Sequence, residues 1–228
     1  MSKAPDDYDK ELMSARLKQA SETLELDLTE KQYQQLLEYL ALFIKWNKSY
    51  NLTAVRDPEQ MLIKHLLDSL SLVPSIEKQS AQRLLDVGTG GGLPGIPLAI
   101  CFPDRHFSLL DSAGKKMRFL FQVKQSLALE NVELHNLRVE QLKTDQKYDA
   151  IISRAFASID DFTALTEHLL AERGSFLAMK GVFPNDELSA VEKNYIVLDH
   201  QNLNVPGLDA ERCLITLGRR GDHDTDSQ

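Results

Sequence analysis

A glycine-rich stretch at residues 86–95, DVGTGGGLPG, constrains the fold of this chain more than any other segment. A short apolar run precedes it at residues 83–85, and a second apolar run follows it at residues 96–101. This order predicts a strand that ends in a carboxylate, then a tight turn and then a helix. Glycines let a ligand approach the backbone, and a helix N-terminus offers free N–H groups to a carboxylate or phosphate. The stretch therefore predicts a small-molecule site.

Strand-like and helical runs alternate from residue 82 onward. We expect strands at residues 83–87, 106–110, 132–136, 149–153, 175–179, 195–203 and 213–217, and helices near 94–102, 114–129, 160–170 and 185–192. This alternation is typical of a twisted, mostly parallel sheet with helices on both faces. No helical run separates the last two strands, so we expect them to pair as an antiparallel hairpin at the sheet edge.

The first part of the chain predicts three helices. One spans roughly residues 8–25, and the second begins after Thr29, where Gln32 completes a capping-box pattern. The third opens at Asp57 and Pro58, a cap followed by proline at the first helical position. We expect a helical extension at residues 1–75 packed on an α/β domain at residues 76–220, with a polar tail at residues 221–228.

Composition and charge limit the classes of function. Hydrophobic and charged residues make up 43% and 26% of the chain, which is ordinary for a soluble globular protein. The apolar stretches are far shorter than the ~20 residues that span a bilayer, and the polar N-terminus is no secretory signal, so we expect a cytoplasmic protein. Cys101 and Cys213 have no metal-site spacing, and no metal is expected. Net charge is −8, yet residues 31–130 carry three more bases than acids, which leaves room for an anionic partner.

Three classes of cofactor bind glycine turns between a strand and a helix. A P-loop needs a Lys and a Ser or Thr after the turn, and neither is suitably placed here. A nicotinamide or flavin turn has a third glycine where this chain has Leu93. Asp111, 23 residues after Gly88, closes the next strand and can accept both hydroxyls of a ribose, whether of a nicotinamide cofactor or of S-adenosylmethionine. The GxGxG spacing and the C-terminal hairpin favour S-adenosylmethionine.

Longer motifs narrow this interpretation. In order along the chain they are WNKSYNLT at 46–53, KHLLDSL at 64–70, LPGIP at 93–97, LDS at 110–112 with KK at 115–116, SRAFA at 153–157 and KG at 180–181. Together they resemble the bacterial small-subunit ribosomal RNA methyltransferase G family, also called glucose-inhibited division protein B, across about residues 25–218. The GxGxG turn is common to many methyltransferases, whereas its combination with WNxxxNLT and SRAFA is specific. Position 64 is a lysine, whereas we expect an arginine there more often.

The resemblance implies a class I S-adenosylmethionine-dependent methyltransferase, with a Rossmann-like, seven-stranded, mostly parallel sheet, one antiparallel edge strand and an N-terminal helical extension. The implied product is N7-methylguanine at guanine 527, in the 530 loop of 16S rRNA, with S-adenosylhomocysteine released. The residues expected at the cofactor are Gly88, Gly90 and Leu93 from the turn, Val139 and Glu140 beside the adenine, and Arg154 closing the pocket. Asp111 is assigned to the ribose from its position alone.

The sequence suggests no catalytic base, and the implied chemistry needs none. Guanine N7 carries a lone pair and no proton, so alignment and electrostatic preorganisation can supply most of the catalysis. The chain also lacks the [DNS]-PP-[YFW] motif of amino-group methyltransferases and any motif around its cysteines typical of a cytosine-C5 nucleophile. These absences favour a ring nitrogen without naming N7.

Several side chains have both a functional and a structural interpretation. Lys115, Lys116, Arg118 and Lys180 are candidates for contact with RNA phosphates, or a solvated basic face. Arg154 could instead form a structural salt bridge. His65 could reach the site or make a core hydrogen bond. Trp46 could stack on a base or pack the N-terminal helices onto the sheet. In the second case Asn47 and Asn51 would tie down the turn.

Two other functions stay open at this stage: a methyltransferase of a small metabolite, and a non-catalytic, cofactor-dependent RNA-binding protein. For the favoured function we expect 16S rRNA as the partner, within the small ribosomal subunit or its precursor. We expect no membrane partner and a monomeric chain.

Overall fold

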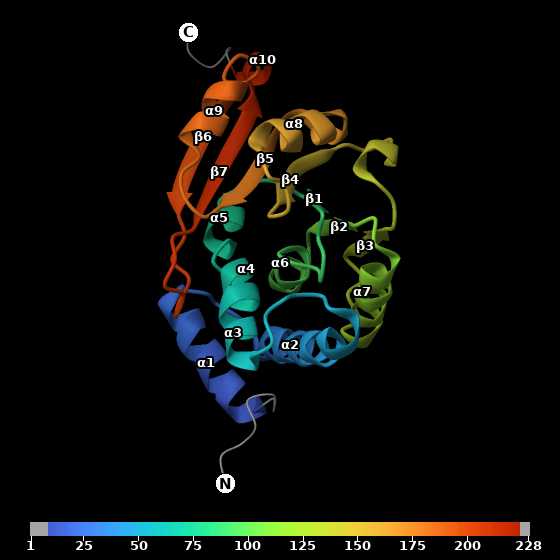
Figure 1. The fold of residues 1–228 in the computed structure, drawn as a ribbon, viewed down its shortest axis with the longest axis vertical. Helices are drawn as coiled ribbons and strands as arrows, with labels where there is room; N and C mark the ends of the chain where they lie inside the picture. Colours follow the sequence, from blue (N-terminus) through green and yellow to red (C-terminus); the bar gives the residue numbers. More distant parts are fainter. Residues whose placement is uncertain (1–8, 224–228) are drawn as a thin grey trace.

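The computed structural model describes residues 9–223 of the chain. Its centre is a seven-stranded sheet with the strand order β3-β2-β1-β4-β5-β7-β6 (Figure 1). The strands are β1 (Arg83–Val87), β2 (His106–Leu110), β3 (Val132–His135), β4 (Tyr148–Ser153), β5 (Leu170–Lys180), β6 (Tyr195–Asn202) and β7 (Cys213–Arg219). The bounds of β1 and β2 are those expected from the sequence. Strand β5 begins earlier than expected, so the mixed α/β class is confirmed with small shifts in strand ends.

The directions of the strands fix where a ligand can bind. Strands β3, β2, β1, β4 and β5 pair in parallel. Strand β7 runs antiparallel to both β5 and β6, so the expected hairpin is confirmed. The reversed strand is β7, which lies between β5 and the edge strand β6. In such sheets ligands bind at the carboxyl ends of the parallel strands.

Helices cover both faces of the sheet (Figure 1). They are α1 (Lys10–Thr23), α2 (Glu30–Tyr50), α3 (Pro58–Met61), the π-helix η1 (Leu62–Leu67), α4 (Asp68–Leu70), α5 (Val73–Glu77), α6 (Gly95–Cys101), α7 (Gly114–Ser126), the 3₁₀-helices η2 (Val139–Gln141) and η3 (Glu167–Leu169), α8 (Ile159–Thr166), α9 (Asn185–Val191) and α10 (Arg220–His223). None within the described residues is long and apolar enough to cross a membrane.

Two hydrophobic cores result from the alternation of side chains along the strands. Leu84 of β1 and Ile152 of β4 join the core beneath the N-terminal helices, α6 and α7. Their neighbours Leu85 and Ile151 face the opposite core, beneath α8 and α9. The N-terminal helices thus share one continuous core with the sheet.

The start of α2 confirms the capping box and shows a use for it. Gln32 N donates to the hydroxyl of Thr29 at 3.3 Å, and Thr29 N donates back to Gln32 Oε1 at 2.8 Å. The side-chain amide of Gln32 also donates to the carbonyls of Ile100 and Cys101, at 3.1 and 3.0 Å. Both carbonyls belong to the last turn of α6, the helix that follows the glycine turn. Gln32 therefore fixes the start of α2 against the end of α6.

Further along α2, aromatic packing decides between the two interpretations of Trp46. Its ring lies 5.7 Å from that of Phe119 on α7 and 4.7 Å from that of Tyr50. Asn47 accepts a hydrogen bond from Thr53 N at 2.8 Å and donates to the carbonyl of Val55 at 2.9 Å. Trp46 therefore packs α2 against α7, and Asn47 ties down the turn, as the structural interpretation predicted.

The third helix begins at Asp57 and Pro58 as predicted, with Gln60 N donating to the Asp57 carboxylate at 2.7 Å. It then widens into the π-helix η1 and narrows again into α4, which sequence patterns did not indicate. At the other end of the chain, α10 occupies the first residues of the expected polar tail. The rest of that tail, from residue 224 on, lies outside the described residues.

Candidate active site

The glycine turn after β1 adopts a conformation that other residues rarely take. Gly88 and Gly90 have φ of +70° and +60°, in the left-handed region. A Cβ on Gly88 would lie 2.7 Å from the Cβ of Ala155, which follows β4. A Cβ on Gly91 would lie 2.3 Å from Cε2 of Phe43 on α2. The turn is therefore pressed between the end of β4 and the N-terminal helices.

Asp86, at the end of β1, fixes this turn through hydrogen bonds to two of its residues. Its Oδ2 accepts hydrogen bonds from the hydroxyl of Thr89 at 2.6 Å and from Gly95 N at 2.9 Å. Its Oδ1 is buried and has no protein partner among the described residues. Burial raises the pKa of the Asp86 carboxyl to about 6, against the lowering effect of these two hydrogen bonds.

Asp111, at the end of β2, holds the same turn from the side. Its Oδ2 accepts from Gly90 N at 3.0 Å and from Lys116 Nζ at 3.2 Å, and its Oδ1 accepts from Ala113 N at 2.9 Å. The sequence assigns Asp111 to a ribose. In the structure this carboxylate also orders the glycine turn and the loop after β2. Lys116, a candidate for contact with RNA, is paired with Asp111 in this structure.

A cavity of about 260 Å³ opens between the turn and the loops after β2, β3 and β4. Four of the residues expected at the cofactor line it: Gly88, Asp111, Val139 and Glu140. Gly90 and Leu93 belong to the adjacent turn but do not line the cavity, and Leu93 is buried. Sequence reasoning missed the apolar lining, Leu110, Leu137, Phe156 and Leu165, although Phe156 lies inside the SRAFA motif.

The chemistry of this lining fits an adenosyl cofactor. Apolar side chains suit a flat purine, and the carboxylates of Asp111 and Glu140 can accept hydrogen bonds from ribose hydroxyls. The described residues place no group of three or more His, Cys, Asp or Glu where it could hold a metal ion.

A second cavity, of about 440 Å³, adjoins the first at the end of β4. Arg154 lines the second cavity, whereas the next residues, Ala155 and Phe156, line the first. Arg154 Nη1 lies 2.7 Å from Oδ2 of the buried Asp68, and Arg212 Nε lies 2.9 Å from its Oδ1. The salt bridge expected as the structural role of Arg154 is therefore present. Its contact with the cofactor stays a prediction.

His65, in the π-helix, lines this second cavity and also makes the core hydrogen bond that the sequence suggested. Its Nε2 lies 2.8 Å from the Thr53 hydroxyl, and its ring packs edge-on against Phe43 at 5.5 Å. Burial, helped by the charge of Arg154, lowers the pKa of His65 to about 4. The imidazole is thus neutral at physiological pH.

The four residues expected at RNA do not form one patch. Lys115 and Arg118 are exposed on α7, whereas Lys116 faces Asp111. Lys180, at the end of β5, lines the second cavity, and its Nζ lies 2.7 Å from the Glu187 carboxylate. None of these contacts shows or excludes binding of RNA.

The N-terminal helix α2 contacts the turn directly, which sequence patterns did not indicate. The hydroxyl of Tyr39 donates to the carbonyl of Gly91 at 2.8 Å. Both Tyr39 and Phe43 are buried, and their rings lie 6.0 Å apart. The sequence predicted the helix that begins after Thr29, but not that Tyr39 and Phe43 pack against the glycine turn.

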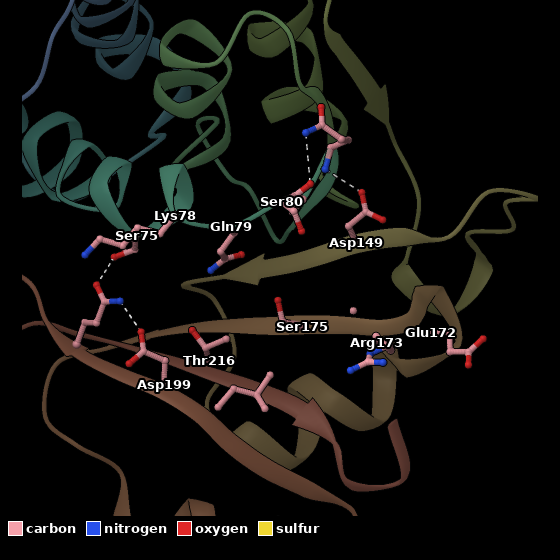
Figure 2. A pocket seen from close by; sticks show the side chains of 15 residues that line it. Ser75, Lys78, Gln79, Ser80, Asp149, Glu172, Arg173, Ser175, Asp199 and Thr216 are labelled. Carbon is pink, nitrogen blue, oxygen red and sulfur yellow. Dashed lines mark hydrogen bonds between the residues drawn. The ribbon is translucent and has the colours of Figure 1, made fainter. Parts of the chain in front are cut away.

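The largest cavity, of about 710 Å³, lies at the opposite edge of the sheet, where β1 and β4 begin. Figure 2 shows its lining, which comes from α5, the loop before β1 and strands β5, β6 and β7. Ser75 donates to Gln201 at 2.6 Å, and Asp149 accepts from Gln82 N at 2.8 Å. None of the residues expected at the cofactor or RNA lines this groove.

Comparisons with known proteins place the chain in a family. Residues 32–215 match the family described as rRNA small subunit methyltransferase G. The chain belongs to this family. It is 58% identical over 202 residues to a ribosomal RNA small subunit methyltransferase G of Saccharophagus degradans, covering 89% of each chain. It is 52% identical to the protein of that name in Ectopseudomonas mendocina, covering 89% of this chain and 94% of the relative.

Solved structures show the fold beyond the methyltransferase G family. An S-adenosylmethionine-dependent methyltransferase from Thiobacillus denitrificans, in complex with S-adenosyl-L-homocysteine, superposes with a TM-score of 0.51 at 12% identity. The match covers 67% of this chain and 91% of that one. The fold is therefore that of class I S-adenosylmethionine-dependent methyltransferases, as the sequence predicted.

Proposed function

We propose that this chain transfers a methyl group from S-adenosylmethionine to N7 of a guanine in 16S rRNA, guanine 527 by the family resemblance. The proposal rests above all on membership of the methyltransferase G family across residues 32–215. The relatives named above are ribosomal RNA small subunit methyltransferases. We place the reaction in the cytoplasm, on the small ribosomal subunit or its precursor.

The residues around the first cavity would hold the cofactor. Gly88 gives the backbone room to pass close to it, Asp111 would accept hydrogen bonds from the ribose, and Glu140 would lie beside the adenine. Val139 and the apolar lining would cover the adenine. When bound, S-adenosylmethionine supplies an electrophilic methyl group on its sulfonium.

The state of the side chains supports attack by a group that needs no deprotonation. His65 is already engaged with Thr53 and is a weak base, because its pKa is lowered to about 4. Burial raises the pKa of the Cys213 thiol and takes that of Cys101 to about 12, so both thiols are poor nucleophiles at neutral pH. Guanine N7 has a free lone pair, so the enzyme needs to align N7, the methyl carbon and the sulfur. Positioning of this kind can account for most of the rate.

The test is a methylation assay with labelled S-adenosylmethionine and small subunits that lack the modification. Naked 16S rRNA and a mixture of small metabolites are run in parallel. We expect label in the RNA at one guanine, with chain cleavage after reduction and aniline treatment, which reports N7-methylguanine. Label in metabolites alone would favour the small-molecule methyltransferase, and cofactor binding without turnover would favour the non-catalytic RNA-binding protein.

A further inference from the structure

The second cavity carries an assignment of its own, which rests on the RNA methyltransferase function proposed above. We propose that it binds a backbone phosphate of the RNA next to the methylated guanosine, with Arg212 and Lys64 as the contacts. Asp68 positions Arg212 and pairs with Arg154, which stays assigned to the cofactor.

The charges lining the cavity are unbalanced toward positive. Its lining includes four cationic side chains, Lys64, Arg154, Lys180 and Arg212, and one carboxylate, Asp68. Glu187 pairs with Lys180 from outside the lining. Two positive charges remain after both carboxylates are counted. A phosphodiester would supply the missing negative charge, whereas a neutral metabolite would not.

The two arginines are held in place and still have donors to offer. Arg154 donates a hydrogen bond from Nη1 to Asp68. Arg212 donates from Nε to Asp68 and from Nη1 to the carbonyl of Glu211. Within residues 9–223, Nη2 of each arginine makes no protein hydrogen bond. Their side chains are 24% and 29% exposed, so a ligand can reach them from the cavity. A guanidinium fixed on one side by a carboxylate is preorganised for a phosphate on the other.

The π-helix η1 presents the N-terminal side of the cavity. Three lining residues come from this segment and from α4, which follows it: Lys64, His65 and Asp68. A π-turn is an uncommon feature that occurs often at functional sites. Here it brings an exposed lysine and a buried carboxylate to the same side of one cavity. Lys64 makes no ion pair within the described residues.

The position of the cavity matches what the reaction requires. Arg154 belongs to this cavity, and Ala155, the next residue, lies beside Gly88 at the cofactor cavity. A nucleotide with its phosphate on Arg212, which shares Asp68 with Arg154, would therefore have its base beside the cofactor. Contact through phosphate carries no sequence information, so the cavity orients the nucleotide and other surfaces select it.

The test compares single-charge removals at the two edges of the sheet. Lys64→Gln and Arg212→Gln are measured against Lys78→Gln, which removes an exposed lysine lining the groove at the opposite edge. Binding of in vitro transcribed 16S rRNA is titrated over a range of KCl. We expect each cavity variant to reduce the slope of log K against log salt by about 0.7 to 0.9, the value of one phosphate contact. Lys78→Gln should keep the slope of the unmodified chain.

Two controls keep the outcomes apart. Affinity for S-adenosylhomocysteine should stay unchanged in Lys64→Gln, whose substituted side chain is exposed, so loss of the fold would not explain a changed slope. Inorganic phosphate, titrated alone, should not bind at millimolar concentration. Equal slopes for all three variants would overturn the phosphate assignment while the unmodified chain still methylates RNA. Phosphate binding that Arg212→Gln abolishes, with an unchanged RNA slope, would also overturn it, in favour of a free-phosphate site. Failure of the unmodified chain to methylate RNA would instead overturn the proposed function.

Discussion

The two edges of the sheet differ in whether their charged side chains are buried or exposed. All three carboxylates that are buried within the described residues, Asp68, Asp86 and Asp111, lie at the carboxyl edge. At the amino edge the groove is larger, but its charged residues are exposed or partly exposed, and include Lys78, Glu172 and Asp199 (Figure 2). Burying a carboxylate is costly unless hydrogen bonds or cations compensate it, so the fold concentrates this cost at one edge.

The comparison teaches that cavity volume is a poor guide to function in this molecule. The groove of about 710 Å³ has hydrogen bonds that join its walls locally, such as Ser75 to Gln201. The cavity of about 260 Å³ has a glycine turn, two carboxylates and an apolar floor that converge from four loops. Five variants, given in order of decreasing expected effect, test this contrast.

Gly88→Ala should have the largest effect, on methyl transfer. The new Cβ would lie 2.7 Å from that of Ala155, at a φ of +70° that L-residues disfavour. The segment between the two cavities would have to move, and a displacement near 1 Å can reduce rate by about 100-fold. Methylation of small subunits measures the loss. The control is Gly221→Ala, where a Cβ would meet nothing within 4 Å, and a comparable loss there would contradict the argument.

Asp86→Asn should change how stability depends on pH. The pKa of Asp86 is raised to about 6 in the folded chain from an unfolded value of 3.8, so folding favours the protonated carboxyl. Its contribution is present below pH 4 and is lost as pH rises through 6, by about 2 to 3 kcal/mol. Urea unfolding between pH 4 and pH 7 should show that the asparagine variant lacks this decline.

The pH dependence of stability expected from His65 has the opposite sign to that expected from Asp86, so it serves as a check on the Asp86 experiment. Its pKa is lowered to about 4, so its contribution is present above pH 6.5 and is lost as pH falls toward 4. The difference between the unmodified chain and His65→Gln should therefore grow with pH, whereas that for Asp86→Asn should shrink. Parallel trends in the two variants would refute the assigned signs.

Asp111→Asn should weaken cofactor binding by about 10-fold, because it removes a charged acceptor worth roughly 1 to 3 kcal/mol. The loss has two sources, the ribose contact predicted from the sequence and the observed bonds to Gly90 N and Lys116. Calorimetry with S-adenosylhomocysteine measures the affinity. Lys116→Gln removes only the salt bridge, so an equal loss in both variants would argue against a ribose contact.

Asp199→Asn, in the groove at the amino edge, should have the smallest effect. Asp199 is exposed and accepts a hydrogen bond from Gln201, which an asparagine oxygen can also accept. We expect unfolding free energy within about 0.5 kcal/mol of the unmodified chain and unchanged methylation. A clear loss of methylation would show that the larger groove serves the reaction, and would end the contrast between the edges.

Much of the fold was predictable because its signals are local. The strands β1 and β2 are short, buried apolar runs, and their ends were predicted to the residue. The cap of α2 depends on two residues three positions apart, Thr29 and Gln32. The glycine turn was recognisable because its residues are consecutive, and four of the seven residues assigned to the cofactor line one cavity.

What escaped prediction depends on contacts between distant segments. Asp68 binds Arg154 and Arg212, which lie 86 and 144 residues further along the chain. Tyr39 and Gly91 are 52 residues apart. The π-helix has no pattern of its own, because its residues repeat their apolar positions much as an α-helix does. Periodicity tells which side of a helix is buried and leaves open what that side meets.

The bond from Tyr39 to Gly91 has a consequence for how such a protein can change over generations. A methyltransferase domain that begins near residue 76 would leave its glycine turn without Tyr39 and Phe43, and the space beside Gly91 would be empty. Recombination that swaps the N-terminal helices between distant relatives would meet the same mismatch. We therefore expect a graft of this turn into another enzyme to keep its shape only when residues 30–50 are carried with it.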